Sequence, residues 1–231
     1  MIRVERVKTE TRAGDVLLRM REDILGCALM PNEKLRFESL KERYKVSFST
    51  LREALARLSA EGLVMSEGQR GFAVAPVSIG DLLDLTNARV LLEREVVRLS
   101  MLHGDDAWEA RILSSYHRMD RLQARLGEHY YFDADWAQLH GAFHAALVDA
   151  CRSPVLLEMR RSLFERAHRY RRMSSQFRTQ WRRKDVEHKA IMDAVLDRDA
   201  DAVGLIERHI RETTENVIEF VGHLFDDATT G

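Results

Sequence analysis

Four histidines at core-facing positions are the side chains of this sequence whose type and spacing best suit a metal ion. His140 and His144 lie four residues apart, which places both imidazoles on one side of a helix and lets them chelate one divalent ion. His188 and His209 each share a helical face with apolar residues farther along the chain. A lone inward histidine is usually a hydrogen-bonded core residue. Four of them on three helices favour convergence on a divalent metal ion, zinc or nickel.

Arg89 is a cation on the apolar face of its helix, four residues after Leu85 and three before Leu92. A buried guanidinium needs a partner, because an uncompensated buried charge costs several kcal/mol. Two partners are open: Glu93 at the i+4 position, or a ligand carboxylate held by two parallel hydrogen bonds.

A basic run later in the chain, Arg169, Tyr170 and Arg172, could supply a second carboxylate contact. Such a run on a helix is otherwise a solvated face. The effector site expected from the sequence therefore contains Arg89, Arg169 and Tyr170. The remaining histidines have no such relation to an apolar face and are expected on the surface: His103, His117, His129, His168 and His223.

The elements that must position these residues are helices. From Ser78 onward, apolar residues recur at intervals of three and four, which predicts an all-α antiparallel helical bundle. Ser78 is placed to cap the first helix, which carries Arg89. None of the three prolines in the chain falls inside a long periodic segment. The later helices are expected at about 105–126, 131–151, 154–177, 181–197 and 199–224.

The first 77 residues have a different pattern, which predicts a winged helix-turn-helix. Three helices are expected at about 11–27, 37–43 and 48–61. Two short strands follow, in residues 63–67 and 71–77, and the glycines between them permit a tight hairpin. The fold class is therefore mainly α, with domains at 1–77 and 78–231.

The helix expected at 48–61 has the features of one that enters the major groove of DNA. Its apolar positions face inward, which leaves Ser47, Ser49, Thr50 and Arg52 near its exposed N-terminal end. Side chains there meet base edges and phosphates. Ser47 is equally explained as the N-cap, and a glutamate partner in the same bundle is the competing use of Arg52.

Charge and cysteine content agree with a DNA-binding head inside the cell. Residues 1–76 hold 14 Lys and Arg against 11 Asp and Glu, whereas the remainder is net acidic. The tip of the hairpin adds Arg70, although hairpin tips are commonly solvated. Cys27 and Cys151 are expected to be reduced packing residues. No apolar run long enough for a membrane span or a signal peptide occurs, so we expect a cytoplasmic protein with no membrane partner.

Residues 29–77 resemble the GntR family of bacterial regulators. The match includes Val46-Ser47, Arg52-Glu53-Ala54-Leu55, Glu61-Gly62-Leu63 and Gly71. The resemblance implies operator contacts by Ser49, Thr50 and Arg52, and by the wing at Arg70 and Gly71.

Two positions depart from that family pattern. Asn32 stands where glycine is usual, and Phe48 stands where an arginine often contacts DNA. Arg36 is expected to take up part of the lost phosphate contact.

Residues 80–223 resemble the FCD ligand-binding domain of the FadR-type branch of that family, on landmarks at Arg89, Phe143-His144, Glu187-His188 and His209-Ile210. The resemblance implies a metal site in which an Asp or Asn usually stands where this chain has His140. It also implies that Arg89 meets an effector carboxylate. The segments 34–44 and 163–171 are further similar to carbon-starvation-induced regulators that respond to a short dicarboxylate such as glutarate.

The function expected from the sequence is a ligand-responsive transcriptional regulator and not an enzyme. A homodimer would bind double-stranded operator DNA as a repressor and release it when a small organic acid binds. Two alternatives remain open at this stage: a metal-dependent enzyme domain carried by a DNA-binding head, and a DNA-binding protein that senses nothing.

Overall fold

The computed structural model describes residues 12–66, 71–177 and 185–222. The chain divides into two compact units, Met1–Val77 and Ser78–Gly231, and each is described by itself. Each unit has its own cluster of buried apolar side chains. In the part of the chain that the structure describes, no helix combines the length and the apolar character that crossing a bilayer requires.

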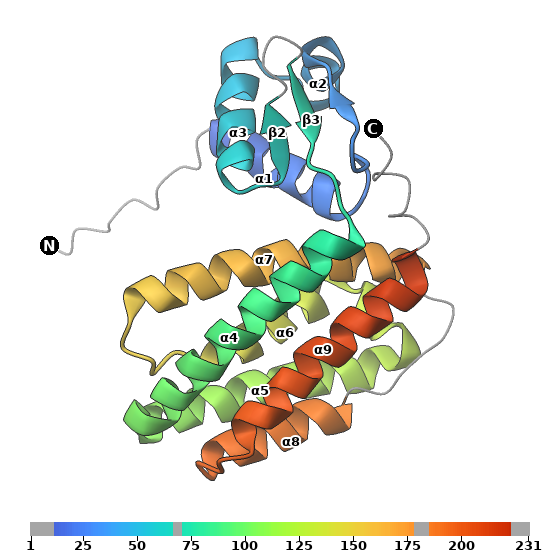
Figure 1. Ribbon diagram of the computed structural model, residues 1–231. Helices are drawn as coiled ribbons and strands as arrows, with labels where there is room; N and C mark the ends of the chain where they lie inside the picture. The colour runs from blue at the N-terminus through green and yellow to red at the C-terminus, as the bar shows by residue number, and fades with distance from the viewer. Residues whose placement is uncertain (1–11, 67–70, 178–184, 223–231) are drawn as a thin grey trace, which may run out of the picture. The chain divides into compact units, whose positions relative to one another are not determined.

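The N-terminal unit consists of three helices and a small sheet (Figure 1). Its elements are α1 (Arg12–Leu25), β1 (Lys34–Leu35), α2 (Phe37–Tyr44), α3 (Phe48–Ala60), β2 (Val64–Ser66) and β3 (Phe72–Val74). The strands are antiparallel in the order β1-β3-β2. The predicted winged helix-turn-helix is confirmed. Strand β1 was not predicted, because two residues are too few to show an alternating pattern.

Local chemistry explains where these elements begin and turn. Asn32, at the position where the family usually has glycine, adopts a left-handed φ of 64°, which asparagine tolerates better than most residues. Leu51, Leu55 and Leu58 of α3 are fully buried, and each such leucine contributes about 1.5–3 kcal/mol of apolar burial. The opposite face of α3 is left exposed.

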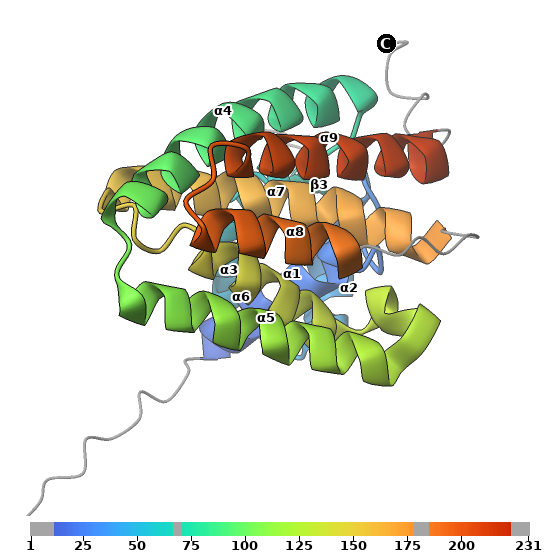
Figure 2. The same cartoon turned by 90° about the horizontal axis from the view of Figure 1, so that it is seen from below.

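The C-terminal unit is entirely helical over the residues described. It contains α4 (Ile79–His103), α5 (Asp106–Leu126), the 3-10 helix η2 (Gly127–Phe132), α6 (Ala134–Ala146), α7 (Pro154–Phe177), α8 (Asp185–Leu196) and α9 (Ala202–Val221). Helix α4 packs on α7 and α9, α5 packs on α6 and α8, and α8 also packs on α9 (Figures 1 and 2). Among the residues described, the buried polar side chains of the unit come from α4, α6, α7, α8 and α9.

The helix expected at 131–151 is shorter than predicted. Residues 127–132 form η2, and Asp133 then caps α6 by accepting a hydrogen bond from the backbone N–H of Trp136 at 2.8 Å. Because α6 begins at this cap and does not continue η2, the cap fixes the direction of its side chains, and His140 and His144 point inward.

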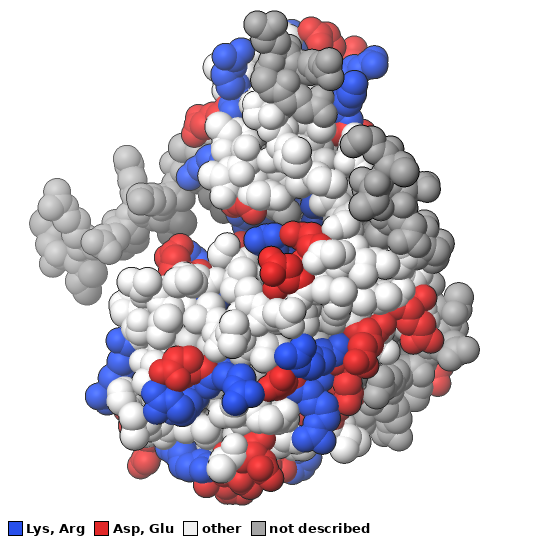
Figure 3. Space-filling model, in the orientation of Figure 1, with Lys and Arg blue, Asp and Glu red and all other residues white. Residues whose placement is uncertain are grey.

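The exposed face of α4 and α9 carries charges of both signs, interspersed over the surface (Figure 3). Arg94 of α4 donates to Glu207 of α9 at 2.7 Å, and Arg211 donates to the same carboxylate at 2.9 Å. Exposed pairs of this kind contribute little stability, about 0–1 kcal/mol each. The polar groups that need explanation lie inside the bundle.

Candidate metal and effector site

Helices α6, α8 and α9 bring the four predicted histidines together. One ligand nitrogen of each lies within 4.8 Å of the others, and all four side chains are buried. His140 and His144 come from successive turns of α6, His188 from α8 and His209 from α9. The Nε2 atom of His140 is 3.1 Å from Nε2 of His188 and 3.2 Å from Nε2 of His144.

Hydrogen bonding alone does not account for this geometry. A ring nitrogen has one in-plane N–H or one in-plane lone pair, so Nε2 of His140 can pair with only one of its two close neighbours. Around a tetrahedral ion with metal–nitrogen bonds of about 2.0–2.1 Å, ligand nitrogens lie about 3.3 Å apart. The observed separations of 3.1 and 3.2 Å fit that arrangement. With all four ligand nitrogens within 4.8 Å of one another, the cluster could hold a divalent ion.

Neighbouring groups orient the histidines. Nδ1 of His209 lies 3.0 Å from Oε2 of Glu187, so a proton on Nδ1 is donated to this carboxylate and Nε2 faces the cluster. Such a carboxylate behind a histidine is the usual support of a metal ligand. Trp136 stacks on His140 at 4.9 Å between ring centroids. Burial and the neighbouring imidazoles hold the pKa of His144 well below its ordinary value, which keeps the ring neutral and able to ligate.

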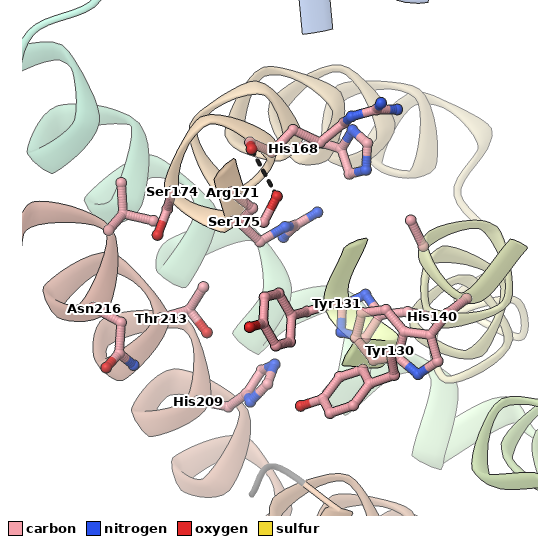
Figure 4. A pocket seen from close by; sticks show the side chains of 14 residues that line it. Tyr130, Tyr131, His140, His168, Arg171, Ser174, Ser175, His209, Thr213 and Asn216 are labelled. Carbon is pink, nitrogen blue, oxygen red and sulfur yellow. Dashed lines mark hydrogen bonds between the residues drawn. The ribbon is translucent and has the colours of Figure 1, made fainter. Parts of the chain in front are cut away.

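A cavity of about 100 Å³ lies beside the histidines (Figure 4). His140 and His209 belong to its wall, so the candidate metal site and the cavity are continuous. The other side chains that line the cavity and are labelled in Figure 4 are Tyr130, Tyr131, His168, Arg171, Ser174, Ser175, Thr213 and Asn216.

Next to this cavity, three arginines surround the ring of Phe164. The Cζ atoms of Arg89, Arg160 and Arg171 lie 5.5, 4.7 and 4.5 Å from the ring centroid. Arg160 donates from Nε to Glu93 at 3.0 Å and from Nη2 to the carbonyl of His144 at 3.1 Å. We refer to Arg89, Arg160, Arg171, Glu93 and Phe164 as the arginine cluster. It holds three cations and one carboxylate.

Two of these cations, Arg89 and Arg171, have a buried nitrogen with no hydrogen-bond partner among the residues described. Burial lowers the pKa of Arg89 to about 10, with Glu93 opposing the shift and Arg160 adding to it. Burial, and then repulsion by Arg89 and Arg160, lowers the pKa of Arg171 to about 9. Both guanidiniums are therefore charged at neutral pH. Nε of Arg89 and Nη2 of Arg171 are buried without a hydrogen-bond partner among the residues described.

The structure resolves which partner Glu93 takes. Of the two partners left open for Arg89, Glu93 forms its ion pair with Arg160, at 3.0 Å. Glu93 nevertheless lies close enough to act on the charge of Arg89, because it opposes the lowering of the Arg89 pKa. Arg89 is not part of the cavity wall.

The other two residues expected at an effector site lie elsewhere on α7. Tyr170 donates its hydroxyl to Asp81 at 2.6 Å and accepts from the backbone N–H of Ser78 at 3.4 Å. Burial and the bond to Asp81 raise the pKa of Tyr170, which keeps it a donor. Arg169 is also buried, and neither residue is part of the cavity wall.

Sequence reasoning missed four residues of this region. His168 was expected on the surface, which is wrong: it lines the cavity, and burial beside Arg171 and Arg172 lowers its pKa to about 3. Arg171, Arg160 and Glu187 were not predicted. The signal for Arg160 and Arg171 was a spacing of four before and seven after Phe164, which puts all three on one face of α7.

In the N-terminal unit, the predicted DNA-contacting residues lie around the start of α3. Ser47 is the N-cap: its Oγ accepts from the backbone N–H of Thr50 at 3.3 Å and lies 2.8 Å from Oγ of Ser49. Arg52 is exposed, and it forms no ion pair with any residue described. Arg36 is exposed at the N-cap of α2.

The wing is described only in part. Gly71 adopts a φ of 99°, a conformation that favours glycine, and leads into β3. Arg70, which was predicted to contact DNA, lies outside the described residues.

A winged helix-turn-helix with an exposed start of its third helix, together with a helical unit that encloses a polar chamber, defines the class of DNA-binding transcriptional regulators. Family comparison makes this specific. Residues 12–74 match the bacterial regulatory proteins of the gntR family, and residues 84–212 match the FCD domain. The chain belongs to the GntR family and carries an FCD domain. It is a transcriptional regulator and not an enzyme.

Characterised and uncharacterised regulators share much of the sequence. The chain is 39% identical to the HTH-type transcriptional regulator BphR of Paraburkholderia xenovorans LB400, over 87% of this chain and 83% of that protein. It is 37% identical to the HTH-type transcriptional repressor GlaR of Escherichia coli K12, over 83% and 89% of the two chains.

Solved structures show the same fold at lower identity. A GntR transcriptional regulator from Rhodococcus sp. RHA1 superposes with a TM-score of 0.68 at 22% identity, over 90% of this chain and 98% of that one. E. coli McbR/YncC superposes with a TM-score of 0.69 at 17% identity, over 94% and 100%.

Proposed function

We propose that this regulator is a repressor that releases its operator when a small organic acid binds in the helical unit beside a divalent metal ion. The observation that carries the proposal is the arginine cluster. Among the residues described, Nε of Arg89 and Nη2 of Arg171 have no hydrogen-bond partner, and Arg171 lines a cavity whose wall includes His140 and His209. A carboxylate is one of the anions that a planar guanidinium binds through two parallel hydrogen bonds.

His140, His144, His188 and His209 would hold the ion, with zinc or nickel matching a set of imidazole ligands. When bound, the ion supplies positive charge that attracts one oxygen of the acid. The chain's own residues do the rest: Arg171 in the cavity wall neutralises and orients the acid, and Trp136 and Tyr130 line the same wall. Arg89 is not part of the wall and adds positive charge from beside the ring of Phe164.

Helix α7 connects the cavity to the start of α4, so it could transmit a movement at the cavity to the DNA-binding unit. Arg171 faces the cavity, and its neighbour Tyr170 bonds to Asp81 and Ser78 in the first turn of α4. Arg166 adds an ion pair to Asp81 at 2.9 Å. Ser78 follows directly on the last residue of the N-terminal unit. A shift of α7 toward a bound acid would therefore act on the segment that joins the two units.

Release requires that the acid favour one arrangement of the protein over another. Couplings of this kind are typically about 1–3 kcal/mol, or 5- to 150-fold in affinity. The proposal includes a homodimer, because helix-turn-helix regulators bind two half-sites with a two-fold axis. Leu83, Leu91 and Leu102 of α4 stay exposed and are available for such an interface.

The test begins with metal analysis of protein purified without a His-tag. Thermal shifts are then measured across mono-, di- and tricarboxylates, with the matching amides as neutral controls. We expect about one metal ion per chain and stabilisation by at least one acid but not by its amide. Arg171→Gln should abolish that stabilisation.

Arg161→Gln is the matched control for this experiment. Arg161 lies on the same helix, but its side chain is 65% exposed, and its ion pair among the residues described is with Glu158, three residues earlier. The control should respond as the wild type does. Indifference of the wild-type protein to every acid would support a DNA-binding protein that senses nothing and would end the effector proposal.

A further inference from the structure

Phe48 is a large apolar side chain at the start of α3, where an aromatic ring is not needed to form the helix. It is the first residue of α3 and follows the N-cap Ser47. Its side chain is 46% exposed, although burying a phenylalanine completely contributes about 1.5–3 kcal/mol. The exposed half of the ring is therefore available for contact with another molecule.

The ring of Phe48 is held in place from behind. Its centroid lies 5.6 Å from that of Phe37, and Phe37 in turn contacts Phe72 of β3 edge-on at 6.2 Å. Nζ of Lys41 lies 5.4 Å from the Phe48 ring centroid. A side chain supported in this way loses little further rotational freedom when it binds.

The surroundings of Phe48 suit DNA. Phe48 lines an open hollow between α2 and the start of α3, together with Ser47 and Thr50. Lys41 and Lys45 bring cations to its rim, and the exposed carboxylates Glu38 and Glu42 also border it. Lysines beside an exposed apolar ring match a surface that meets a phosphate backbone while the ring reaches past it toward a base edge.

We propose that Phe48 is a specificity-determining residue that contacts the C5 methyl group of a thymine in the major groove of each operator half-site. A phenyl ring has no donor for the acceptors of guanine, but it gains from apolar contact with a thymine methyl. This inference rests on the proposed role of α3 as the helix that enters the groove.

The test starts from duplexes selected by the wild-type protein from a randomised pool. Each thymine of the selected half-site is replaced singly by uracil, which removes only the methyl group. At one thymine, the wild type should lose about three- to five-fold in affinity per half-site, the factor expected of one buried methyl group. If no thymine shows this dependence, the inference is wrong, whatever the variants do.

Variants assign the effect to Phe48. Phe48→Ala should bind the thymine and uracil duplexes equally, whereas Phe48→Leu should keep a preference for thymine. Phe48→Arg should select guanine at that position. A ring that only packs against Phe37 would give a different result: Phe48→Ala would weaken all duplexes alike and keep the same dependence on the methyl group.

Arg52→Ala distinguishes failure of the Phe48 inference from failure of the proposal that α3 enters the major groove. Loss of binding by Arg52→Ala together with equal methyl dependence in wild type and Phe48→Ala would overturn the Phe48 inference alone. Unchanged DNA binding by Arg52→Ala and by Phe48→Ala would show that α3 does not contact DNA. The proposed role of α3 and the inference on Phe48 would then both be wrong.

Discussion

Replacing Glu187 by glutamine tests whether the histidine cluster is a metal site or a packed core. Oε2 of Glu187 lies 3.0 Å from Nδ1 of His209, so the substitution keeps the shape of the side chain and weakens the support of one ligand. Removing such a supporting carboxylate typically lowers metal affinity about 10- to 100-fold. Because the Glu187 side chain is 24% exposed, we expect the lower end of that range.

A tenfold loss of affinity is about 1.4 kcal/mol at saturating metal, since a ligand that binds only the folded state stabilises it by its binding free energy. For a protein of this size, 1 kcal/mol moves the melting temperature by about 2–4 °C. Glu187→Gln should therefore melt about 3–6 °C below the wild type in a zinc or nickel buffer, by differential scanning fluorimetry.

The same helix offers a matched control. The side chain of Asp193 on α8 is 47% exposed, and its ion pair within the described part of the chain is with Lys189, at 2.6 Å. Asp193→Asn should melt with the wild type in both metal and chelator. After chelation, the difference in melting temperature between Glu187→Gln and the wild type should shrink to within about 1 °C if the carboxylate acts through the metal. A gap of the same size with and without metal would refute the metal assignment, because Glu187 would then act only on the fold.

Three other substitutions test separate parts of the account. Arg160→Met leaves the buried carboxylate of Glu93 without the arginine that pairs with it, so the free energy of unfolding measured in urea should fall by about 3–5 kcal/mol. A fall of less than about 1 kcal/mol would mean that water solvates the pair. Tyr170→Phe removes the hydroxyl that donates to Asp81. The affinity for the acid, followed by thermal shift, should stay within about two-fold of wild type. The factor by which the acid weakens DNA binding should drop to about 5-fold or less, the lower limit of typical coupling. Intact release in this variant would exclude transmission through α7. Ser47→Ala removes the N-cap of α3 and should cost about 1 kcal/mol in urea unfolding, and an unchanged midpoint would show that the cap contributes nothing.

Much of the fold could be predicted because its signals are local. The N-cap Ser78, the glycine at position 71 and the apolar spacing of α3 and α4 each act within a few residues, and the predicted winged helix and helical bundle are confirmed. The break at Asp133 was missed because apolar spacing continues across it, and only the cap to Trp136 shows where α6 begins.

The histidines of the site could be predicted from the sequence, whereas Arg171 in the cavity wall could not. The four histidines could be chosen because each stands out on an apolar face, and the structure brings one ligand nitrogen of each within 4.8 Å of the others. Arg169 and Arg171 lie two residues apart on a basic helix, so their side chains point about 200° apart around it, and the sequence pattern does not show which of the two sides faces inward. Which of them faces the cavity depends on how α7 packs against α4 and α9, which a sequence pattern does not reveal.

We expect an anion bound beside these buried cations to lower the affinity of the N-terminal unit for DNA. The most direct measurement is fluorescence anisotropy of a selected duplex bound to the metal-loaded wild-type protein, titrated with the carboxylate that stabilises it most. We expect DNA affinity to fall at least tenfold for the wild type and to stay constant for Arg171→Gln. An unchanged DNA affinity while the acid saturates the wild-type protein would contradict the account.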